Sequence, residues 1–466
     1  MSTSGGQRHQ RLSAIDTGFW LAESPQCPLH IGYVGFGKGT TLTHEGLVAH
    51  VRERLHLLPR HRQRIRATPV GLGRPVWVDD PDFDIANHVR HRPTGRQGDR
   101  DPLECVSEIV TRPLDLRRSP WEVWLLDGFE DDTVVVVVRY HHCMLDAVGM
   151  VNLAHALFDD SPSSRPLQAP PWKPAPEPSD ATLLAWLVRD AAVAIVRTLR
   201  ELGWRGTARA GRDLLNVQRH QRSQERRPAP KTVLAQPIGP RRRLISVEVP
   251  IADVRAIQRR TGATINDVVL SVSTWAVGRL QERKGKSSPG ELLVHVPISL
   301  REPGEGQSSA PGNRITLIAA RLPLGDGEGR PALARTREIM DGYKATDGGR
   351  LVATLDRASN ALPLPLLARI SRKHFSSDGY NLIVTNIPGP PATYLMGLKA
   401  QQVVPLGFLT PGHALTVAVL SYEDKLSFGL LADPDAIDDL DQLAGDIEAG
   451  FEALRPSPLR APPEAR

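Results

Sequence analysis

Apolar and polar residues in the N-terminal half of the chain follow two periods, which predict alternating strands and helices. Continuous apolar runs at residues 28–36 and 133–140 indicate buried strands. The second run, TVVVVVRY, pairs with residues 122–129 as a β-hairpin across the polar turn EDD. Helical spacing indicates one helix at residues 43–57, with Thr43 as its N-cap, and another at residues 147–158.

The same alternation returns in the C-terminal half. Strands are predicted at residues 243–249, 292–298, 315–322, 381–387, 400–405, 414–421 and 425–431. Helices are predicted at residues 251–261, 264–281 and 436–454, with two more inside 330–375 that a Pro-rich break near 363–365 separates. We therefore expect an α/β protein built from two lobes with a cleft between them.

Pro- and Ser-rich stretches divide the chain. Residues 161–179 and 227–240 predict two linkers, and a basic helical segment stands between them. The expected organisation is an N-terminal lobe at 1–160, a connecting segment at 161–240 and a C-terminal lobe at 241–466. Within the connecting segment, residues 181–227 hold ten Arg and four acidic residues, an excess as large as the net charge of +6 of the whole chain.

Composition limits the class of protein. With 40% hydrophobic and 24% charged residues among 466, the chain has the make-up of a globular protein and not of a disordered or fibrous one. Its cysteines, Cys27, Cys105 and Cys143, are too few and too scattered for a disulfide framework or a structural zinc site. The N-terminus lacks a signal-peptide core, and no apolar run is long enough for a membrane span. We expect a cytoplasmic protein.

The strongest chemical signal is RYHHCMLDAVG at residues 139–149. His141 and His142 stand where the buried strand ends, and Asp146 follows four residues after His142 at the start of a helix. An imidazole accepts a proton from a hydroxyl near neutral pH, which makes a general base. The carboxylate of Asp146 is expected either to fix the ring tautomer or to brace the loop by pairing with an Arg elsewhere.

Two other interpretations of the histidine pair are open. The histidines can be ordinary turn residues at a strand end, satisfied by local hydrogen bonds. They can also be metal ligands, but adjacent histidines rarely point at one ion, and no third ligand lies at a helpful spacing. We expect no metal site.

Several motifs in order along the chain resemble those of the bacterial wax ester synthase/diacylglycerol acyltransferase family, within the chloramphenicol acetyltransferase-like superfamily. HHCMLDA at 141–147 is similar to the HHxxxDG motif of that superfamily, and the Asn266-Asp267 pair is similar to the family's Asn-Asp motif. Further likenesses are RLSAIDTGFWLAESPQCPLHIG, RPLDLRRSPWEVWLLDG, VPISLR, PGNRITL and NLIVTNIPGP. Together they extend over about residues 11–455.

This resemblance implies a two-lobed chloramphenicol acetyltransferase-like fold with a crossover segment and its active site at the lobe interface. It implies direct O-acylation of a long-chain alcohol or a diacylglycerol by acyl-CoA, which is a substrate, so no cofactor is expected. His142 is then the general base, His141 shapes the loop and Asp146 is mainly structural. Asn266 either stabilises charge near the reaction centre or caps a helix. No Gly-x-Ser-x-Gly elbow is present, so no acyl-enzyme is expected.

Two departures from the family pattern bear on the substrate. The motif Gly is Ala147 here, which costs on the order of 1 kcal/mol or narrows the channel if the position needs a positive φ or close substrate approach. Gly149 is expected to supply part of the lost flexibility. The family's Pro-Leu-Trp stretch reads Ser-Pro-Trp and ends at Trp121, which changes the expected acceptor lining. Both changes point to an altered substrate.

The Gly-rich stretch at residues 32–39, GYVGFGKG, nearly spells a phosphate-binding loop. Residue 39 is Gly, however, where Ser or Thr is needed to reach the magnesium ion. We interpret this stretch as a loop without nucleotide binding.

The basic helical segment has two interpretations of equal weight. Its apolar residues recur among arginines, as in helices that lie on an anionic membrane surface. These apolar residues are Trp186, Leu187, Val193, Val196, Leu199 and Trp204. The alternative is a crossover helix whose apolar face packs on a lobe. Peripheral contact with the inner membrane or lipid droplets therefore stays open, whereas no nucleic-acid fold signature accompanies the charge and we expect no nucleic acid.

Two rival functions follow from the same residues. An acyltransferase of the same mechanism can tailor a specialised metabolite, with a carrier-protein thioester as donor, and Ala147 and the Ser-Pro-Trp stretch slightly favour this. A catalytically silent lipid- or acyl-binding protein on a membrane surface is the rival from another class, and the intact His142 and Asp146 weigh against it.

Overall fold

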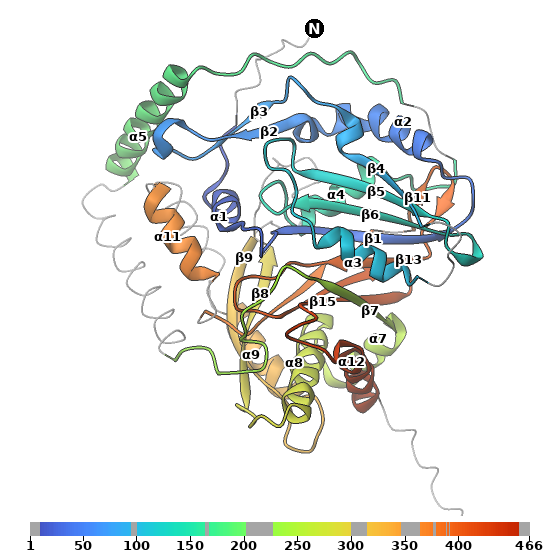
Figure 1. Cartoon of the computed structure of the whole chain (residues 1–466). Helices are drawn as coiled ribbons and strands as arrows, with labels where there is room; N and C mark the ends of the chain where they lie inside the picture. The colour runs from blue at the N-terminus through green and yellow to red at the C-terminus, as the bar shows by residue number, and fades with distance from the viewer. Residues whose placement is uncertain are drawn as a thin grey trace, which may run out of the picture.

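The computed structural model describes residues 10–94, 100–163, 167–201, 227–299, 315–345, 364–375, 379–387, 389–390 and 392–455, and it forms two lobes (Figure 1). The N-terminal lobe is built on a five-stranded sheet of order β13-β1-β6-β5-β4. These strands are β1 (His30–Lys38), β4 (Val89–Pro93), β5 (Trp121–Asp127), β6 (Thr133–His141) and β13 (Gln402–Leu406). The predicted hairpin is confirmed as β5 and β6, which pair antiparallel.

Strand β6 lies in the middle of this sheet, and its apolar run is buried on both faces. It pairs antiparallel with β1, and the register places His30 opposite His141. Gly32 permits the close approach of the two strands, since a Cβ there would lie 1.9 Å from the carbonyl oxygen of Val138. The interpretation of residues 32–39 as a loop was wrong, because β1 continues through Lys38.

Helices of the N-terminal lobe begin at side-chain caps. Helix α1 (Ala14–Ala22) starts with a capping box between Ser13 and Asp16, and α2 (His44–Arg54) is capped by Thr43 as predicted. Two further helices are α3 (Pro102–Val110) and α4 (Ala147–Leu157). A small ribbon of β2 (Gln63–Arg66) and β3 (Val76–Asp79) carries the short 3₁₀ turn η3 (Pro69–Gly71) at its tip.

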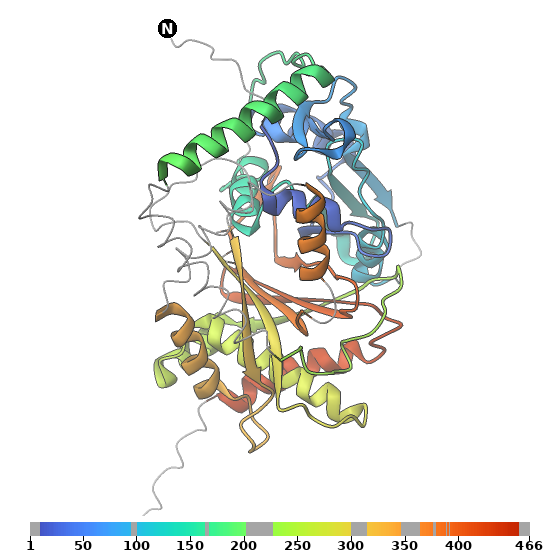
Figure 2. The ribbon, with the colours of Figure 1, turned by 90° about the vertical axis from the view of Figure 1, so that its left-hand side faces the viewer.

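The C-terminal lobe is a six-stranded sheet of order β7-β15-β14-β10-β8-β9. Its strands are β7 (Arg243–Pro250), β8 (Glu291–Ser299), β9 (Ile315–Pro323), β10 (Leu382–Ile387), β14 (Leu415–Tyr422) and β15 (Lys425–Ala432). Helices α7 (Ile251–Thr261), α8 (Ile265–Arg283), α9 (Leu333–Ala345) and α12 (Leu440–Leu454) cover the sheet face turned away from the N-terminal lobe (Figures 1 and 2). These bounds confirm the predicted elements to within a few residues.

Two elements from the C-terminal half belong spatially to the N-terminal lobe. Strand β13 adds to its sheet by pairing with β1, and helix α11 (Leu364–His374) packs against α1. The region 241–466 is therefore not a self-contained lobe. One apolar core also includes residues of both sheets, among them Tyr140 from β6 and Ile383 from β10. The lobes thus share a core along their interface.

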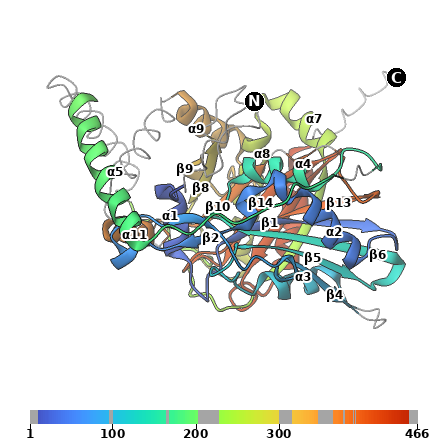
Figure 3. The same ribbon diagram turned by 90° about the horizontal axis from the view of Figure 1, so that it is seen from above.

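Helix α5 (Asp180–Glu201) lies along one side of the molecule, at the start of the basic segment (Figure 3). Its side chains Leu183 and Trp186 pack with Val76 and Val78 of β3. The packed-crossover interpretation therefore holds for this part of the helix. The predicted apolar residue Trp204 lies outside the described residues. No helix in the described ranges is long and apolar enough to cross a membrane.

Candidate active site

The turn that carries His142 is held by backbone hydrogen bonds to both neighbouring segments. The His142 N–H donates to the Leu29 carbonyl at 2.8 Å, and the His141 N–H donates to the Pro120 carbonyl at 2.9 Å. His141 is the last residue of β6, and His142 is the first residue of the turn that follows. Only 7% of His142 is exposed, so the turn places its imidazole inside the protein.

The imidazole of His142 lies among aromatic rings that come from both halves of the sequence. The Phe19 ring of α1 stacks on it, with centroids 3.9 Å apart and planes 7° apart. Phe408, which follows β13, meets it edge-on at 5.4 Å. Phe375, at the end of α11, contacts Phe19 at 5.6 Å. These contacts fix the plane of the ring and place His142 at the lobe interface.

The side chain of His141 braces the turn. Its Nε2 lies 3.0 Å from a carboxylate oxygen of Glu23, and its Nδ1 accepts the Cys143 N–H at 3.2 Å. Since Nδ1 is an acceptor, we assign the proton to Nε2, which donates to Glu23. The same Glu23 oxygen accepts the Leu29 N–H at 2.6 Å. Glu23 therefore links the end of α1, β1 and the histidine turn, a role that sequence reasoning missed although the residue lies within the resembling N-terminal motif.

Asp146 joins the turn to helix α4. It is fully buried, and its Oδ1 accepts the Gly149 N–H at 2.7 Å as the N-cap of the helix. Ala147 is the first helical residue, a conformation that alanine adopts readily, so the anticipated cost of a positive φ does not arise. Gly149 lies inside the helix, and a Cβ there would lie 2.9 Å from the Leu145 Cβ. Close packing, and not flexibility, accounts for that glycine.

Cys143 is the nearest potential nucleophile to the two histidines in sequence. Burial raises the pKa of its thiol well above the ordinary value, and its side chain is only 1% exposed. A thiol in this state is inert as a nucleophile. The turn thus offers a base without an activated cysteine beside it, which suits direct transfer.

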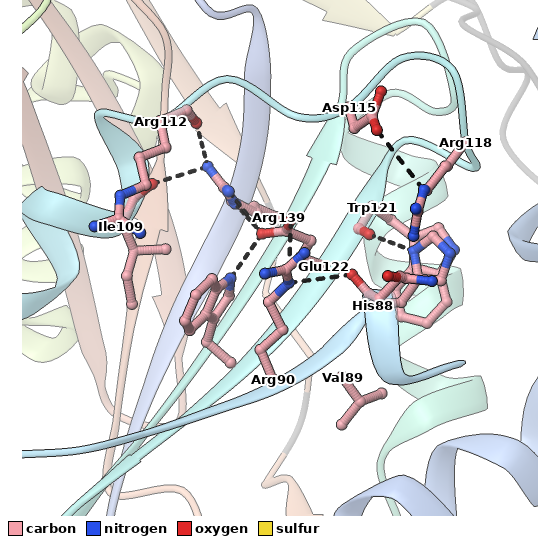
Figure 4. Close-up of polar contacts among 12 residues, drawn as sticks. His88, Val89, Arg90, Ile109, Arg112, Asp115, Arg118, Trp121, Glu122 and Arg139 are labelled. Atoms are coloured by element: carbon pink, nitrogen blue, oxygen red, sulfur yellow. Dashed lines mark hydrogen bonds and ion pairs between the residues drawn. The ribbon is translucent and has the colours of Figure 1, made fainter. Parts of the chain in front are cut away.

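A buried ion pair stabilises the opposite face of the hairpin (Figure 4). Arg139 donates to one oxygen of Glu122 through Nε at 3.1 Å and Nη2 at 2.6 Å, and its Nη1 donates to the Ile109 carbonyl at 2.9 Å. Trp124 donates to the same Glu122 oxygen at 2.7 Å. Burial lowers the pKa of Arg139, and the Glu122 carboxylate opposes this shift. The network fixes β5 against β6 two residues before the histidine turn.

Trp121, expected to line the acceptor site, is a core residue of the N-terminal lobe. Its indole N–H donates to the His61 carbonyl at 2.8 Å, and its ring stacks on His88 with centroids 4.7 Å apart. Only 1% of its surface is exposed. These contacts hold β5 in the lobe, and a role in substrate binding stays a prediction.

The Asn266–Asp267 motif lies at the start of α8, beyond the sheet from the N-terminal lobe (Figure 1). The helix is capped by Thr264, so the expectation of Asn266 as N-cap was wrong. Asp267 completes the capping box by accepting the Thr264 N–H at 2.8 Å. Asn266 is half-buried at the second position of the helix. Its charge-stabilising role stays a prediction.

An apolar pocket lies between β1, β6 and α4 of the N-terminal lobe and β14 of the other lobe. It is lined by Tyr33 and Val136 of the sheet, Met150 of α4, Phe158 just after α4, and Leu420 of β14. Along β6, Val136 is five residues from His141, the last residue of the strand, which is about 17 Å at about 3.3 Å per residue. The pocket suits a hydrocarbon chain.

Within the described ranges, no three His, Cys, Asp or Glu residues are close enough together to hold an ion. His142 itself is surrounded by aromatic carbon, whereas His141 is engaged by Glu23 and Cys143. The adjacent histidines thus serve separate sets of contacts.

Comparison with known proteins agrees with this geometry. Residues 12–269 match the wax ester synthase/diacylglycerol acyltransferase catalytic domain, and residues 311–455 match the WS/DGAT C-terminal domain. A Mycobacterium tuberculosis protein named as a probable diacylglycerol O-acyltransferase is 30% identical over 466 residues, covering 95% of each chain. Another M. tuberculosis protein named for the same activity is 31% identical over 424 residues, covering 86% of this chain and 87% of its own.

Solved structures show the same fold. The wax ester synthase/diacylglycerol acyltransferase of Marinobacter aquaeolei is 22% identical, with a TM-score of 0.64 over 96% of this chain and 98% of that one. The trichothecene 15-O-acetyltransferase of Fusarium sporotrichioides is 14% identical, with a TM-score of 0.65 over 98% and 96%.

The two sheets and the HHxxxD turn at the end of β6 thus form the same fold as these solved acyltransferase structures. Both family models and the relatives then place the chain more narrowly. It belongs to the wax ester synthase/diacylglycerol acyltransferase family, as the resemblance implied.

Proposed function

We propose that this enzyme transfers a fatty acyl group from acyl-CoA to the hydroxyl of a long-chain alcohol or a diacylglycerol, yielding wax esters or triacylglycerol. The observation that carries the proposal is that His142 and an apolar pocket both lie against one apolar core, to which both lobes contribute. A solved condensation domain with the same fold, 15% identical and with a TM-score of 0.58, is a complex with C8-CoA, which supports a CoA donor.

In the proposed reaction, His142 takes the proton from the acceptor hydroxyl as its oxygen attacks the thioester carbonyl. The tetrahedral oxyanion then collapses, the C–S bond breaks, and CoA leaves as a thiol after receiving that proton. Glu23 and His141 hold the turn from one side, and Asp146 anchors it to α4 from the other. The ring stack with Phe19 keeps the imidazole in one plane during both proton transfers.

The experiment is thiol release by the purified full-length enzyme from acyl-CoAs of increasing chain length, with hexadecanol, a diacylglycerol or no acceptor. The variant is His142→Ala, and the matched control is His155→Ala, a partly exposed histidine of α4. Loss of a general base should slow acceptor-dependent release by about 10²–10⁴-fold, with the control unchanged. Equal rates for wild type and His142→Ala would refute the base assignment. Inactivity of the wild type on every pair would instead favour a specialised acceptor or a silent lipid-binding protein.

A further inference from the structure

Large exposed apolar side chains are concentrated on one side of the molecule. Of the seven within the described residues, only Leu57 lies elsewhere. The other six are on three elements, namely Val70 and Leu72 at η3, Leu184 and Val188 on α5, and Leu366 and Ile370 on α11. Figures 1 to 3 place these three elements on the same side, and we call it the η3–α5–α11 surface. Single exposed apolar residues are ordinary, but this gathering indicates an interaction site.

The first two elements pack on each other and direct apolar side chains outward. Leu187 of α5 fills the space beside Gly73, just after η3, while Leu184 and Val188 remain on the outer side. Val70 is 86% exposed and has a φ of 57°. A β-branched residue rarely adopts a positive φ, so the turn presents this side chain at a local cost of about 1–3 kcal/mol in general experience. A strained residue whose side chain packs against nothing else in the protein is typical of a site that contacts a partner.

Helix α11 has an inner face and an outer face of different chemistry. Ser371 packs against Gly18 of α1, and Leu367 is buried beside it. The outer face carries the apolar pair Leu366 and Ile370 one turn apart. Its exposed charged residues are all basic, namely Arg369, Arg372 and Lys373, and residues 364–375 contain no acidic residue. Apolar and basic side chains on one exposed face match a lipid surface with anionic headgroups.

We propose that the η3–α5–α11 surface docks the enzyme onto an anionic lipid surface, with the apolar side chains in the headgroup region and the α11 cations against lipid phosphates. This goes beyond acyl transfer, because docking needs no acyl-CoA. It also has a functional consequence under the proposed function. Phe375 follows the last residue of α11, its ring contacts Phe19, and Phe19 stacks on His142. Docking would therefore bring lipid to α11, which is connected to the His142 imidazole through the rings of Phe375 and Phe19.

The test is flotation of the full-length protein with vesicles of phosphatidylcholine alone or mixed with phosphatidylglycerol. We expect binding to the mixed vesicles that weakens with added salt. Leu366→Ser with Ile370→Ser, and separately Arg369→Gln with Arg372→Gln, should each weaken binding by about tenfold or more. Leu57→Ser is the matched apolar control, since Leu57 is 49% exposed outside the surface.

A second pair of substitutions, on another element, keeps the proposal testable if the α11 variants fail to fold. Val70→Ser with Leu72→Ser should weaken vesicle binding as well, with the circular dichroism spectrum unchanged. Transfer to a soluble short-chain acceptor should be equal in all these variants, which separates docking from catalysis. Vesicle binding unaffected by both apolar pairs would overturn the proposal. So would a dimer, seen by light scattering, that the same substitutions dissociate, because the surface would then bind a second copy.

Discussion

The ring of Phe19 lies flat on the imidazole of His142, with centroids 3.9 Å apart and an angle of 7° between the planes. Helix α1 thus supplies the surface on which the proposed base rests, although 123 positions separate the two residues in the sequence. Phe408 meets the same imidazole edge-on from the other half of the chain. The orientation of the proposed base therefore depends on contacts between segments from both halves of the sequence.

Replacing Phe19 by Leu should lower kcat while leaving the KM for acyl-CoA nearly unchanged. The stacked pair is lost, and such pairs contribute about 0.5–1.5 kcal/mol, which corresponds to roughly a 2- to 10-fold lower kcat if the loss falls on the transition state. Steady-state kinetics at saturating acceptor measures this. Phe428→Leu is the control, because the buried Phe428 ring packs edge-on against Phe451 in the core of the C-terminal lobe. An equal fall in both variants would contradict a specific role for the stack.

Replacing Glu23 by Ala should destabilise the fold and slow the reaction together. The substitution leaves the buried His141 Nε2–H and the Leu29 N–H without their acceptor, a loss of about 1–3 kcal/mol in the free energy of unfolding. Glu23→Gln keeps an acceptor oxygen and should recover most of the stability. Urea unfolding compares the two variants, and equal losses in both would show that the carboxylate charge, and not hydrogen bonding, is what matters.

Breaking the ion pair between Glu122 and Arg139 should lower the free energy of unfolding by more than the Glu23 substitution does. Glu122→Ala leaves Arg139 buried without its carboxylate, and such losses reach about 3–5 kcal/mol. The double variant Glu122→Met with Arg139→Met removes both charges and should lose less stability than the single one. Chemical denaturation checks the order. A double variant less stable than Glu122→Ala would contradict this account of the pair.

Acidification should destabilise the protein through histidines that are buried without charge. Burial lowers the pKa of His61 to about 3 from 6.5, and burial also lowers the pKa of His30 and His88. Below pH 6.5 the unfolded chain binds protons that the folded one does not, so the free energy of unfolding falls as pH drops from about 6.5 toward 3. Urea midpoints measured between pH 7.5 and 5 should show this decline. His61→Phe should reduce the slope, and an unchanged slope would exclude His61 as a contributor.

Filling the apolar pocket should shorten the preferred acyl or alkyl chain. Ala154 of α4 lines the pocket and is 4% exposed, so Ala154→Phe places a ring inside it. We expect transfer of long-chain substrates to fall by about tenfold or more while short-chain transfer persists, since overpacking itself costs only about 1–3 kcal/mol. Ala86→Phe, on an exposed turn, is the control. Equal losses at every chain length would indicate general damage and not a pocket effect.

The local features of the site are readable from the sequence. The apolar run of β6, the polar turn before it and the helix after Asp146 each depend on neighbours within a few positions. The histidine pair could therefore be placed at a strand end, and Thr43 could be identified as a cap. Asn266 shows the limit of such reasoning, because Asn and Thr both cap helices and the structure places Thr264, not Asn266, at the N-cap of α8.

By itself, the sequence determined the α/β elements, the two-part organisation and the HHxxxD turn, since periodicity and capping are properties of short segments. Only the tertiary structure decided what surrounds that turn. Strand β13 crosses into the N-terminal sheet, Phe19 and Phe408 enclose His142, and Glu23 binds His141. These contacts join segments more than a hundred residues apart, and no local pattern specifies them. Burial of a shared apolar core brings them together, because that core is complete only when both lobes pack.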